Sequence, residues 1–161
     1  MPTDQIKIHD FSYTLYRWAY DYHNSVNDLL DKHPGLAMFA VKYNNACLAF
    51  ELIIKSHIAH KNHASTPEAL DKVMRGYGHS LVRLARYAVE EIGLYLPDED
   101  WKKLELVDKY YATHQFRYPP YEPRKSDLNH IELLAAINEL RFITATMLVV
   151  AHEQTDGYAI S

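Results

Sequence analysis

The sequence predicts an all-α fold, an up-and-down bundle of four long helices plus one short helix. Apolar side chains recur at steps of three and four residues along most of the chain, which is typical of amphipathic helices. No segment of useful length alternates polar and apolar residues as a strand does. Most connections between the long periodic segments are short, which favours antiparallel neighbours.

The central element of this bundle is predicted over residues 36–62. Its segment 44–63, NNACLAFELIIKSHIAHKNH, is apolar on almost every side, and such a helix needs neighbours on most sides. Glu51 and Lys55 stand four residues apart, in the order that favours an ion pair within a helix. Cys47, the single cysteine, lies in the same segment and is expected to be a buried apolar residue.

A first helix is predicted from Asp10, a candidate N-cap, to the His33-Pro34-Gly35 sequence. Proline cannot continue the helical hydrogen bonds and glycine permits the exit turn, so the helix ends there. Its apolar face has helical spacing and consists of Phe11, Leu15, Trp18, Tyr22, Val26, Leu29 and Leu30. The whole chain is expected to form one domain, with flexible ends at about residues 1–9 and 155–161.

A short helix and a longer one are predicted next. Ser65-Thr66-Pro67-Glu68 has the signature of a helix start, and the short helix is expected to reach about Met74. Gly76 and Gly78 then interrupt the helical pattern, which resumes over residues 79–93.

A further helix is predicted to begin at Pro97-Asp98-Glu99-Asp100, where the acids face the positive end of the helix dipole, and to end near His114. Residues 115–126, QFRYPPYEPRKS, contain three prolines and are expected to be irregular. Because Phe116, Tyr118 and Tyr121 lie in this connector, we expect it to be held against the bundle.

The last helix is predicted to start at the cap Ser126-Asp127. Its apolar residues alternate steps of three and four, at Leu133, Ala136, Leu140, Ile143, Met147 and Val150. Such a seam suits packing within a bundle or against a second chain.

Composition restricts the functional classes. The formal net charge of −4 does not favour a polyanionic partner, so a nucleic-acid role needs a local basic patch. The 13 tyrosines suit half-buried surfaces and interfaces. No secretory leader is recognisable, and no uninterrupted apolar run is judged long enough to span a bilayer. A cytoplasmic location, no membrane association and no cofactor are therefore expected.

Three short motifs resemble the HEPN-type helical domains, small prokaryotic proteins of toxin–antitoxin and phage-defence systems. They are the core helix with Phe50-Glu51 and Lys55, the Gly78-His79-Ser80-Leu81 sequence that opens a later helix, and the Phe116-Arg117-Tyr118-Pro119 connector. The resemblance implies a helical bundle that forms a homodimer.

The ribonucleases of that family carry an Arg followed, after four to six residues, by a His on the last helix. Here Arg141 is followed at those positions by Thr146, Met147 and Leu148, and the next histidine is His152. Arg17 and His23 match the spacing in the first helix, but six residues turn a helix through about 240°, so their side chains diverge. The departure indicates a member without catalytic residues.

Basic residues recur at steps of three and four around the interrupted turn: Lys72, Arg75, His79, Arg83 and Arg86. A helix N-terminus with arginine side chains suits phosphate groups, and Arg117, Arg124 and Lys125 would add to the site if the connector folds back. The predicted ligand-binding residues are His79, Arg83, Arg86, Arg117 and Tyr118. The alternative interpretation is a solvated face, or a structural role for His79 and Arg117.

A second pattern is His57, His60 and His63, whose spacing puts imidazoles on adjacent turns. Two such imidazoles can hold a divalent metal ion, but a convergent third ligand is not evident, and polar surface is the alternative. We therefore predict no metal site from this pattern.

The leading hypothesis is a non-catalytic HEPN-like module that self-associates and binds a partner protein or a nucleotide or RNA ligand. The alternative is a divergent metal-independent ribonuclease of a toxin–antitoxin or phage-defence system. That enzyme would combine His79 with Arg83 or Arg117, since a histidine can transfer protons near neutral pH.

Overall fold

The computed structural model describes residues 3–62, 65–117 and 129–155. Over these ranges the chain is all-α, as predicted, and contains no strand. The elements are α1 (Thr3–Lys32), α2 (Phe39–Lys61), α3 (Pro67–Tyr77), α4 (Leu81–Tyr87), the π-helical segment η1 (Ala88–Ile92), α5 (Asp98–Tyr111) and α6 (His130–Thr155).

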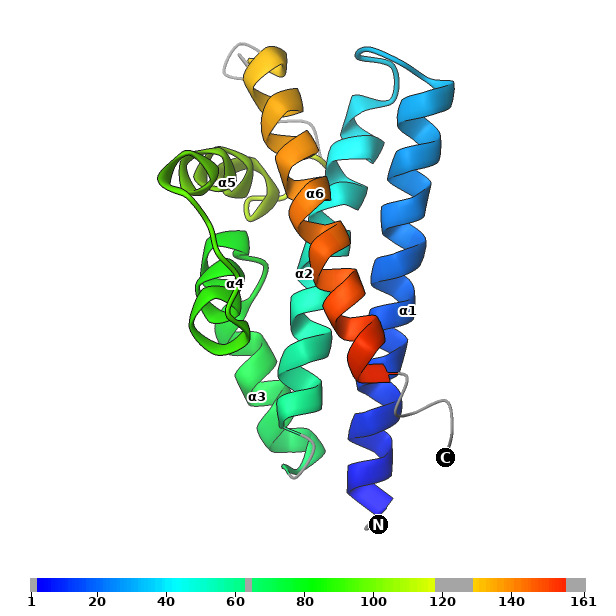
Figure 1. Ribbon diagram of the computed structural model, residues 1–161, viewed down its shortest axis with the longest axis vertical. Coiled ribbons are helices and arrows are strands. Elements are labelled where there is room, and N and C mark those ends of the chain that lie inside the picture. The colour runs from blue at the N-terminus through cyan, green and yellow to red at the C-terminus, as the bar shows by residue number, and fades with distance from the viewer. Residues whose placement is uncertain (1–2, 63–64, 118–128, 156–161) are drawn as a thin grey trace.

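Three long helices run along the molecule, and α1 points in the direction opposite to α2 and α6 (Figure 1). They contain 30, 23 and 26 residues for α1, α2 and α6, and the remaining α-helices are shorter. In Figure 1 α5 is seen nearly end-on, so it crosses the direction of the long helices. Helix α2 packs against all the other α-helices, namely α1, α3, α4, α5 and α6.

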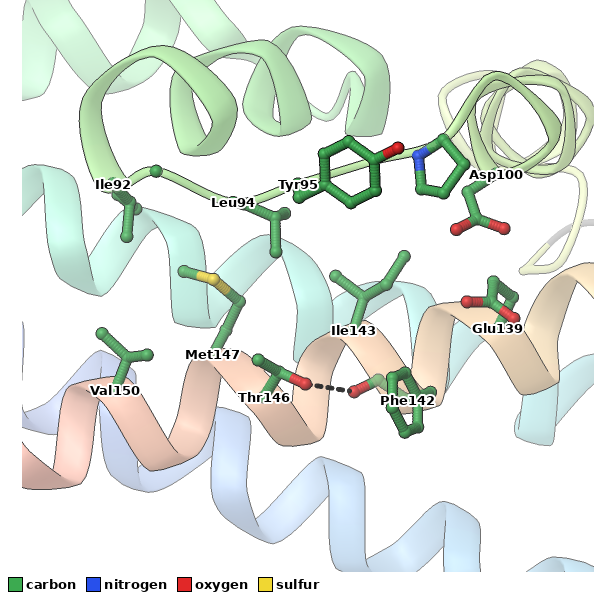
Figure 2. Close-up of a pocket in the computed structure, with 12 residues that line it drawn as sticks. Ile92, Leu94, Tyr95, Asp100, Glu139, Phe142, Ile143, Thr146, Met147 and Val150 are labelled. Carbon is green, nitrogen blue, oxygen red and sulfur yellow. Dashed lines mark hydrogen bonds between the residues drawn. The ribbon is translucent and has the colours of Figure 1, made fainter.

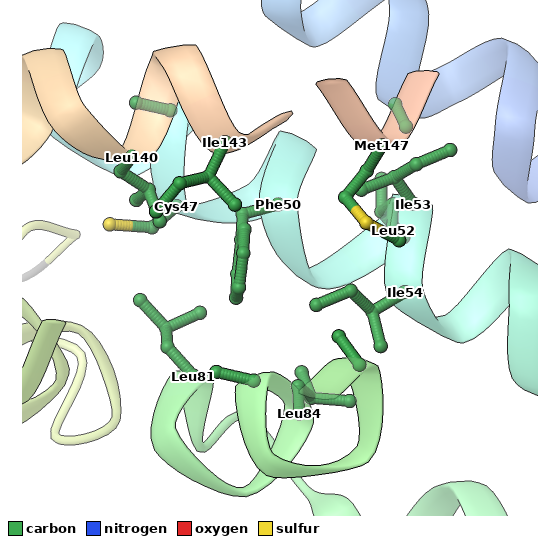
Figure 3. Packing of buried hydrophobic residues seen from close by; sticks show 14 of the residues in the cluster. Cys47, Phe50, Leu52, Ile53, Ile54, Leu81, Leu84, Leu140, Ile143 and Met147 are labelled. Atoms are coloured by element: carbon green, nitrogen blue, oxygen red, sulfur yellow. The ribbon is translucent and has the colours of Figure 1, made fainter. Parts of the chain in front are cut away.

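The central position of α2 follows from its sequence, which offers apolar side chains on every side. Phe50 and Ile54 are fully buried where α2 meets α4, which contributes Leu81 and Leu84, as Figure 3 shows. On another side, Met147 of α6 is 1% exposed and packs in the same cluster. The predicted central helix, with its buried Cys47, is therefore confirmed.

Helix α1 begins at Thr3, before the expected start at Asp10. Residues 3–9, which belong to the segment expected to be a flexible end, are helical. Ile8 is 2% exposed and lines an apolar hollow together with Leu70 of α3. This tertiary contact explains the extension, because packing of an apolar face stabilises helices more than local propensity does.

The turn between α1 and α2 is fastened by a buried lysine. The Lys42 ammonium donates hydrogen bonds to the carbonyl oxygens of His33 and, at 3.1 Å, of Gly35. These carbonyls lie where α1 ends and lack helical partners. Gly35 has a φ of 69° and Met38 a φ of 56°, so two left-handed residues reverse the chain direction.

The helical pattern of the sequence is interrupted at Gly76 and Gly78, and in the structure the chain makes a sharp turn there. Helix α3 starts as expected, with the Thr66 side chain accepting from the backbone N–H of Ala69, but it extends to Tyr77. Gly78 has a φ of 57°, which a residue with a Cβ rarely adopts, and the next helix begins at Leu81. The helix expected over residues 79–93 is thus shorter and changes to the π-helical η1 at Ala88.

Helix α6 is described from His130, and the expected cap Ser126-Asp127 lies outside the described residues. Asn129 takes the capping position, since its side-chain oxygen accepts from the backbone N–H of Glu132 at 3.2 Å. By length and composition alone, the segment His130–Glu153 is apolar enough to cross a membrane. That criterion is also met by core helices of soluble proteins, and 44% of the apolar window is buried here.

Candidate functional site

The buried carboxylate of Glu51, in the middle of α2, organises a polar cluster inside the bundle. Glu51 is 3% exposed. It accepts a hydrogen bond from the Lys55 ammonium at 2.6 Å and another from the hydroxyl of Tyr111 on α5. His79 Nδ1 lies 3.0 Å from one carboxylate oxygen and 3.2 Å from the other. Three side chains, from α2, from the turn before α4 and from α5, therefore meet one acidic group.

These donors determine the charge of Glu51. Burial by itself raises the pKa of its carboxyl group, but the hydrogen bonds from Lys55 and Tyr111 and the charges of Lys55 and His79 outweigh that effect. The pKa consequently lies below its ordinary value, so Glu51 is a carboxylate at neutral pH. Burial and the adjacent Glu51 charge raise the pKa of Tyr111, which therefore stays a phenol and donates.

The turn that carries His79 is fixed on both sides. Lys55 donates to the carbonyl of Gly78 at 2.8 Å. Asp108 of α5 accepts from the hydroxyl of Ser80 at 3.1 Å and from the backbone N–H of Leu81 at 2.7 Å. Because Asp108 binds the first backbone N–H of α4, it acts as a remote N-terminal cap. Hydrogen bonds from two helices thus anchor the backbone on either side of His79.

A second histidine lies beside His79 at the end of α5. The ring centres of His79 and His114 are 5.3 Å apart and their planes make an angle of 71°. Half of the His79 side chain, 46%, is exposed, so this pair reaches the surface above the buried Glu51. His114 has a φ of 60°, a left-handed conformation. The pair was not predicted from the sequence, since its members are distant along the chain.

Arg117 is fixed near the same cluster. Its Nε donates to the side-chain oxygen of Asn44 at 3.1 Å, and its positive charge lowers the pKa of Tyr111 against the stronger effects of burial and Glu51. Phe116, beside it, is 5% exposed and packs edge-on against Tyr43 of α2. The start of the connector is therefore held against the bundle, as expected. Tyr118, Arg124 and Lys125 lie outside the described residues.

The other two predicted ligand-binding residues have different surroundings. Arg83 and Arg86 line a hollow of about 530 Å³ between α3 and the α4–η1 segment, and His79 is not part of its lining. Two tyrosines, Tyr77 and Tyr87, lie in the same wall with their rings 5.8 Å apart. Arg83 also donates to the carbonyl of Gly76 at 3.2 Å. The structure thus divides the four predicted residues that it describes between two places.

The two acidic residues of this hollow are Glu90 and Glu91. Glu91 forms an ion pair with Lys61 of α2. The hollow therefore combines guanidinium groups, phenol rings and carboxylates in one open depression.

A third, more apolar hollow of about 430 Å³ lies between the η1–α5 connector and α6 (Figure 2). Tyr95 and Phe142 border it and are strongly exposed, at 82% and 70%. Ile143 and Met147 form its floor on α6. This face contains few groups that could take part in chemistry, and its exposed rings suit a contact with another apolar surface.

The histidine series on α2 does not form one site. His57 is buried and its Nε2 has no hydrogen-bond partner, whereas His63 lies outside the described residues. Burial, together with the charge of His60, lowers the pKa of His57 despite a hydrogen bond with the Met147 backbone. In the part of the chain that the structure describes, no group of three or more His, Cys, Asp or Glu side chains is arranged to hold a metal ion.

Sequence reasoning identified His79, Arg117 and the Glu51–Lys55 pair but missed the contributions of Tyr111, His114 and Asp108. Only the relative placement of α2, α4 and α5 brings these groups together. Comparison of the chain with protein-family models, with curated proteins and with solved structures gives no match.

Proposed function

We propose that this protein is a non-catalytic HEPN-like helical module of the cytoplasm that self-associates and binds a partner protein or a nucleotide-type ligand. In this proposal the up-and-down part of the bundle consists of α1, α2 and α6, and α5 is the fourth of the long helices. Helices α3 and α4 are then two short helices, where the expected architecture has one.

The ligand proposal rests on the residues that line the hollow next to α4. Arg83 and Arg86 bring two guanidinium groups, which pair with phosphate oxygens in a bidentate geometry. Tyr77 and Tyr87 bring aromatic faces, on which nucleobases stack. The volume of about 530 Å³ is within the range of small-molecule sites. Phosphate and a planar base are the two parts of a nucleotide, which this lining would contact together.

Self-association would use the outer face of α6. Ile131, Phe142 and Val149 are exposed there, at 85%, 70% and 60%. A two-fold dimer brings the same surface of each subunit together, so a single exposed apolar face suffices for both sides. A Phe142→Asp substitution is then expected to shift the protein to a monomer in light scattering, whereas Trp18→Asp on α1 leaves the mass unchanged.

The ligand proposal is tested by titrating the protein with ADP in a calorimeter. Arg83→Ala combined with Arg86→Ala is expected to abolish binding. The control is Arg75→Ala, because Arg75 is 81% exposed, pairs with Asp71 and does not line the hollow. Equal affinity of all three proteins, or no binding of ADP by the unmodified chain, would contradict the nucleotide assignment.

The Glu51–His79–His114 arrangement favours a second candidate, the metal-independent ribonuclease. One imidazole would take the proton of a ribose 2′-hydroxyl as that oxygen attacks phosphorus, and the other would protonate the departing 5′-oxygen. The products would be a 2′,3′-cyclic phosphate and a 5′-hydroxyl end. Cleavage of a single-stranded RNA in the presence of EDTA that disappears in His79→Ala would replace the non-catalytic proposal with this one.

A further inference from the structure

The ring centres of the two surface imidazoles, which form an edge-to-face pair, are as far apart as those of two imidazoles bound to one metal ion. Two imidazoles bound to one tetrahedral Zn²⁺ at about 2.0 Å have ring centres about 5.2 Å apart. The ring centres of His79 and His114 are 5.3 Å apart, and their planes are inclined by 71°. The rings are therefore already at the spacing of a metal-bound pair before any ion is added.

The tautomer of His79 is also the one that a metal needs. Nδ1 of His79 lies 3.0 Å and 3.2 Å from the two carboxyl oxygens of Glu51, so this nitrogen is placed to donate its proton to Glu51. In the neutral ring, the other nitrogen, Nε2, then has a lone pair, and a metal ion would displace the second proton of a charged ring. A carboxylate that holds the far nitrogen of a histidine is the usual support of a metal-ligating imidazole.

The backbone conformation of His114 is a second observation, independent of the ring spacing. The N–H of Gln115 bonds to the carbonyl of Tyr110 and the N–H of His114 to that of Tyr111, both at 2.9 Å. This pattern ends a helix with a left-handed residue, a position that glycine usually occupies. A histidine with a φ of 60° stands here instead, and its ring lies next to His79. A strained backbone that presents a functional side chain is typical of binding and catalytic sites.

We propose that His79 and His114 bind one divalent transition-metal ion, Zn²⁺ being the best fit, through Nε2 of His79 and a ring nitrogen of His114. The described residues offer no group of three protein ligands, so the remaining coordination positions are open to water or to an oxygen of an external ligand. Imidazole nitrogen favours Zn²⁺, Ni²⁺ and Cu²⁺ over Mg²⁺ and Ca²⁺, which prefer oxygen ligands. The site is separate from the arginine-lined hollow and does not depend on nucleotide binding.

The test uses Zn²⁺ alone, added to the full chain without a polyhistidine tag. Calorimetry of the unmodified protein is expected to show one saturable Zn²⁺ site per chain and no binding of Mg²⁺. His114→Gly is the sharpest variant, because glycine suits the left-handed backbone and the protein should melt at or above the original temperature. We expect this variant, and His79→Gln, to lose the saturable site.

The matched control is His33→Ala, since His33 is exposed in the turn after α1 and far along the chain from the pair. This control is expected to bind Zn²⁺ as the unmodified chain does. Zn²⁺ should also raise the melting temperature of the unmodified protein and of the control but not that of His114→Gly. Saturable Zn²⁺ binding that persists in His114→Gly, or its absence from the unmodified protein, would overturn the proposal.

Discussion

The hydroxyl groups of Ser12 and Ser56 form a reciprocal pair of hydrogen bonds across the contact between α1 and α2. Ser12 Oγ donates to the Ser56 carbonyl at 2.9 Å, and Ser56 Oγ donates to the Ser12 carbonyl at 2.8 Å. Both residues are at least 94% buried, since their exposed fractions are 6% and 5%. The pair fixes the register of α1 against α2 with polar contacts inside an apolar interface.

Replacing either serine by alanine should lower the free energy of unfolding by about 1 kcal/mol, the net contribution of one buried hydrogen bond. No buried donor is left unpaired, because the hydroxyl itself is removed. Urea denaturation of the two single variants and the double variant measures the change in the free energy of unfolding. Thr14→Ala, which removes an exposed local hydrogen bond to the Asp10 carbonyl, is the control for a hydroxyl outside the pair. An unchanged midpoint in the double variant would show that the pair has no role in stability.

Glu51→Gln should destabilise the protein by about 3 kcal/mol, because it leaves the largely buried Lys55 ammonium without its charged partner. The control is Glu91→Gln, which breaks the exposed ion pair with Lys61 and should change stability by less than about 0.5 kcal/mol. Chemical denaturation at pH 7 measures the free energy of unfolding of the Glu51→Gln and Glu91→Gln variants. Equal effects of both substitutions would contradict the organising role of Glu51.

Asp108→Ala should lower stability by about 1–2 kcal/mol, because the carboxylate caps α4 through the N–H of Leu81 and the hydroxyl of Ser80. Asp71→Ala removes an exposed aspartate that pairs with Arg75 and serves as the control. Hydrogen exchange of the α4 amides gives the local readout. Exchange should become faster in Asp108→Ala alone, and unchanged protection there would rule out the capping role.

The buried His57 should make the protein less stable in mild acid. Burial, with the nearby His60 charge, lowers the folded-state pKa of His57 below the ordinary 6.5, so the unfolded chain binds the proton more readily. Its contribution to stability is therefore complete above about pH 6.5 and is lost as the pH falls towards the lower folded pKa. His23, whose pKa is lowered by burial and by Arg141, acts in the same direction.

Replacing His57 by leucine, which is apolar and suits the buried site, should flatten the pH dependence of the unfolding free energy between pH 7 and 5. Combining it with His23→Leu should flatten that curve further. The exposed His33→Leu is expected to leave its slope unchanged. Urea denaturation across this pH range provides the measurement, and a slope that survives both buried substitutions would exclude these histidines as its origin.

The sequence by itself determined the helical fold, the central place of α2 and the turns after α1 and α3. These features depend on local information: apolar periodicity, proline and glycine at chain reversals, and the Thr66 cap. Periodicity could not give the start of α1 or of α4, because contacts of Ile8 and Asp108 with other helices set those limits.

Only the tertiary structure decided which polar groups share a site. Glu51 meets His79 and Tyr111 across separations of 28 and 60 residues, and no local pattern encodes such a meeting. The left-handed turn at Gly78 likewise turns His79 towards Glu51, while Arg83 and Arg86 line a separate hollow. Helix formation is a property of neighbouring residues, whereas the partners of a buried charge depend on how several helices pack.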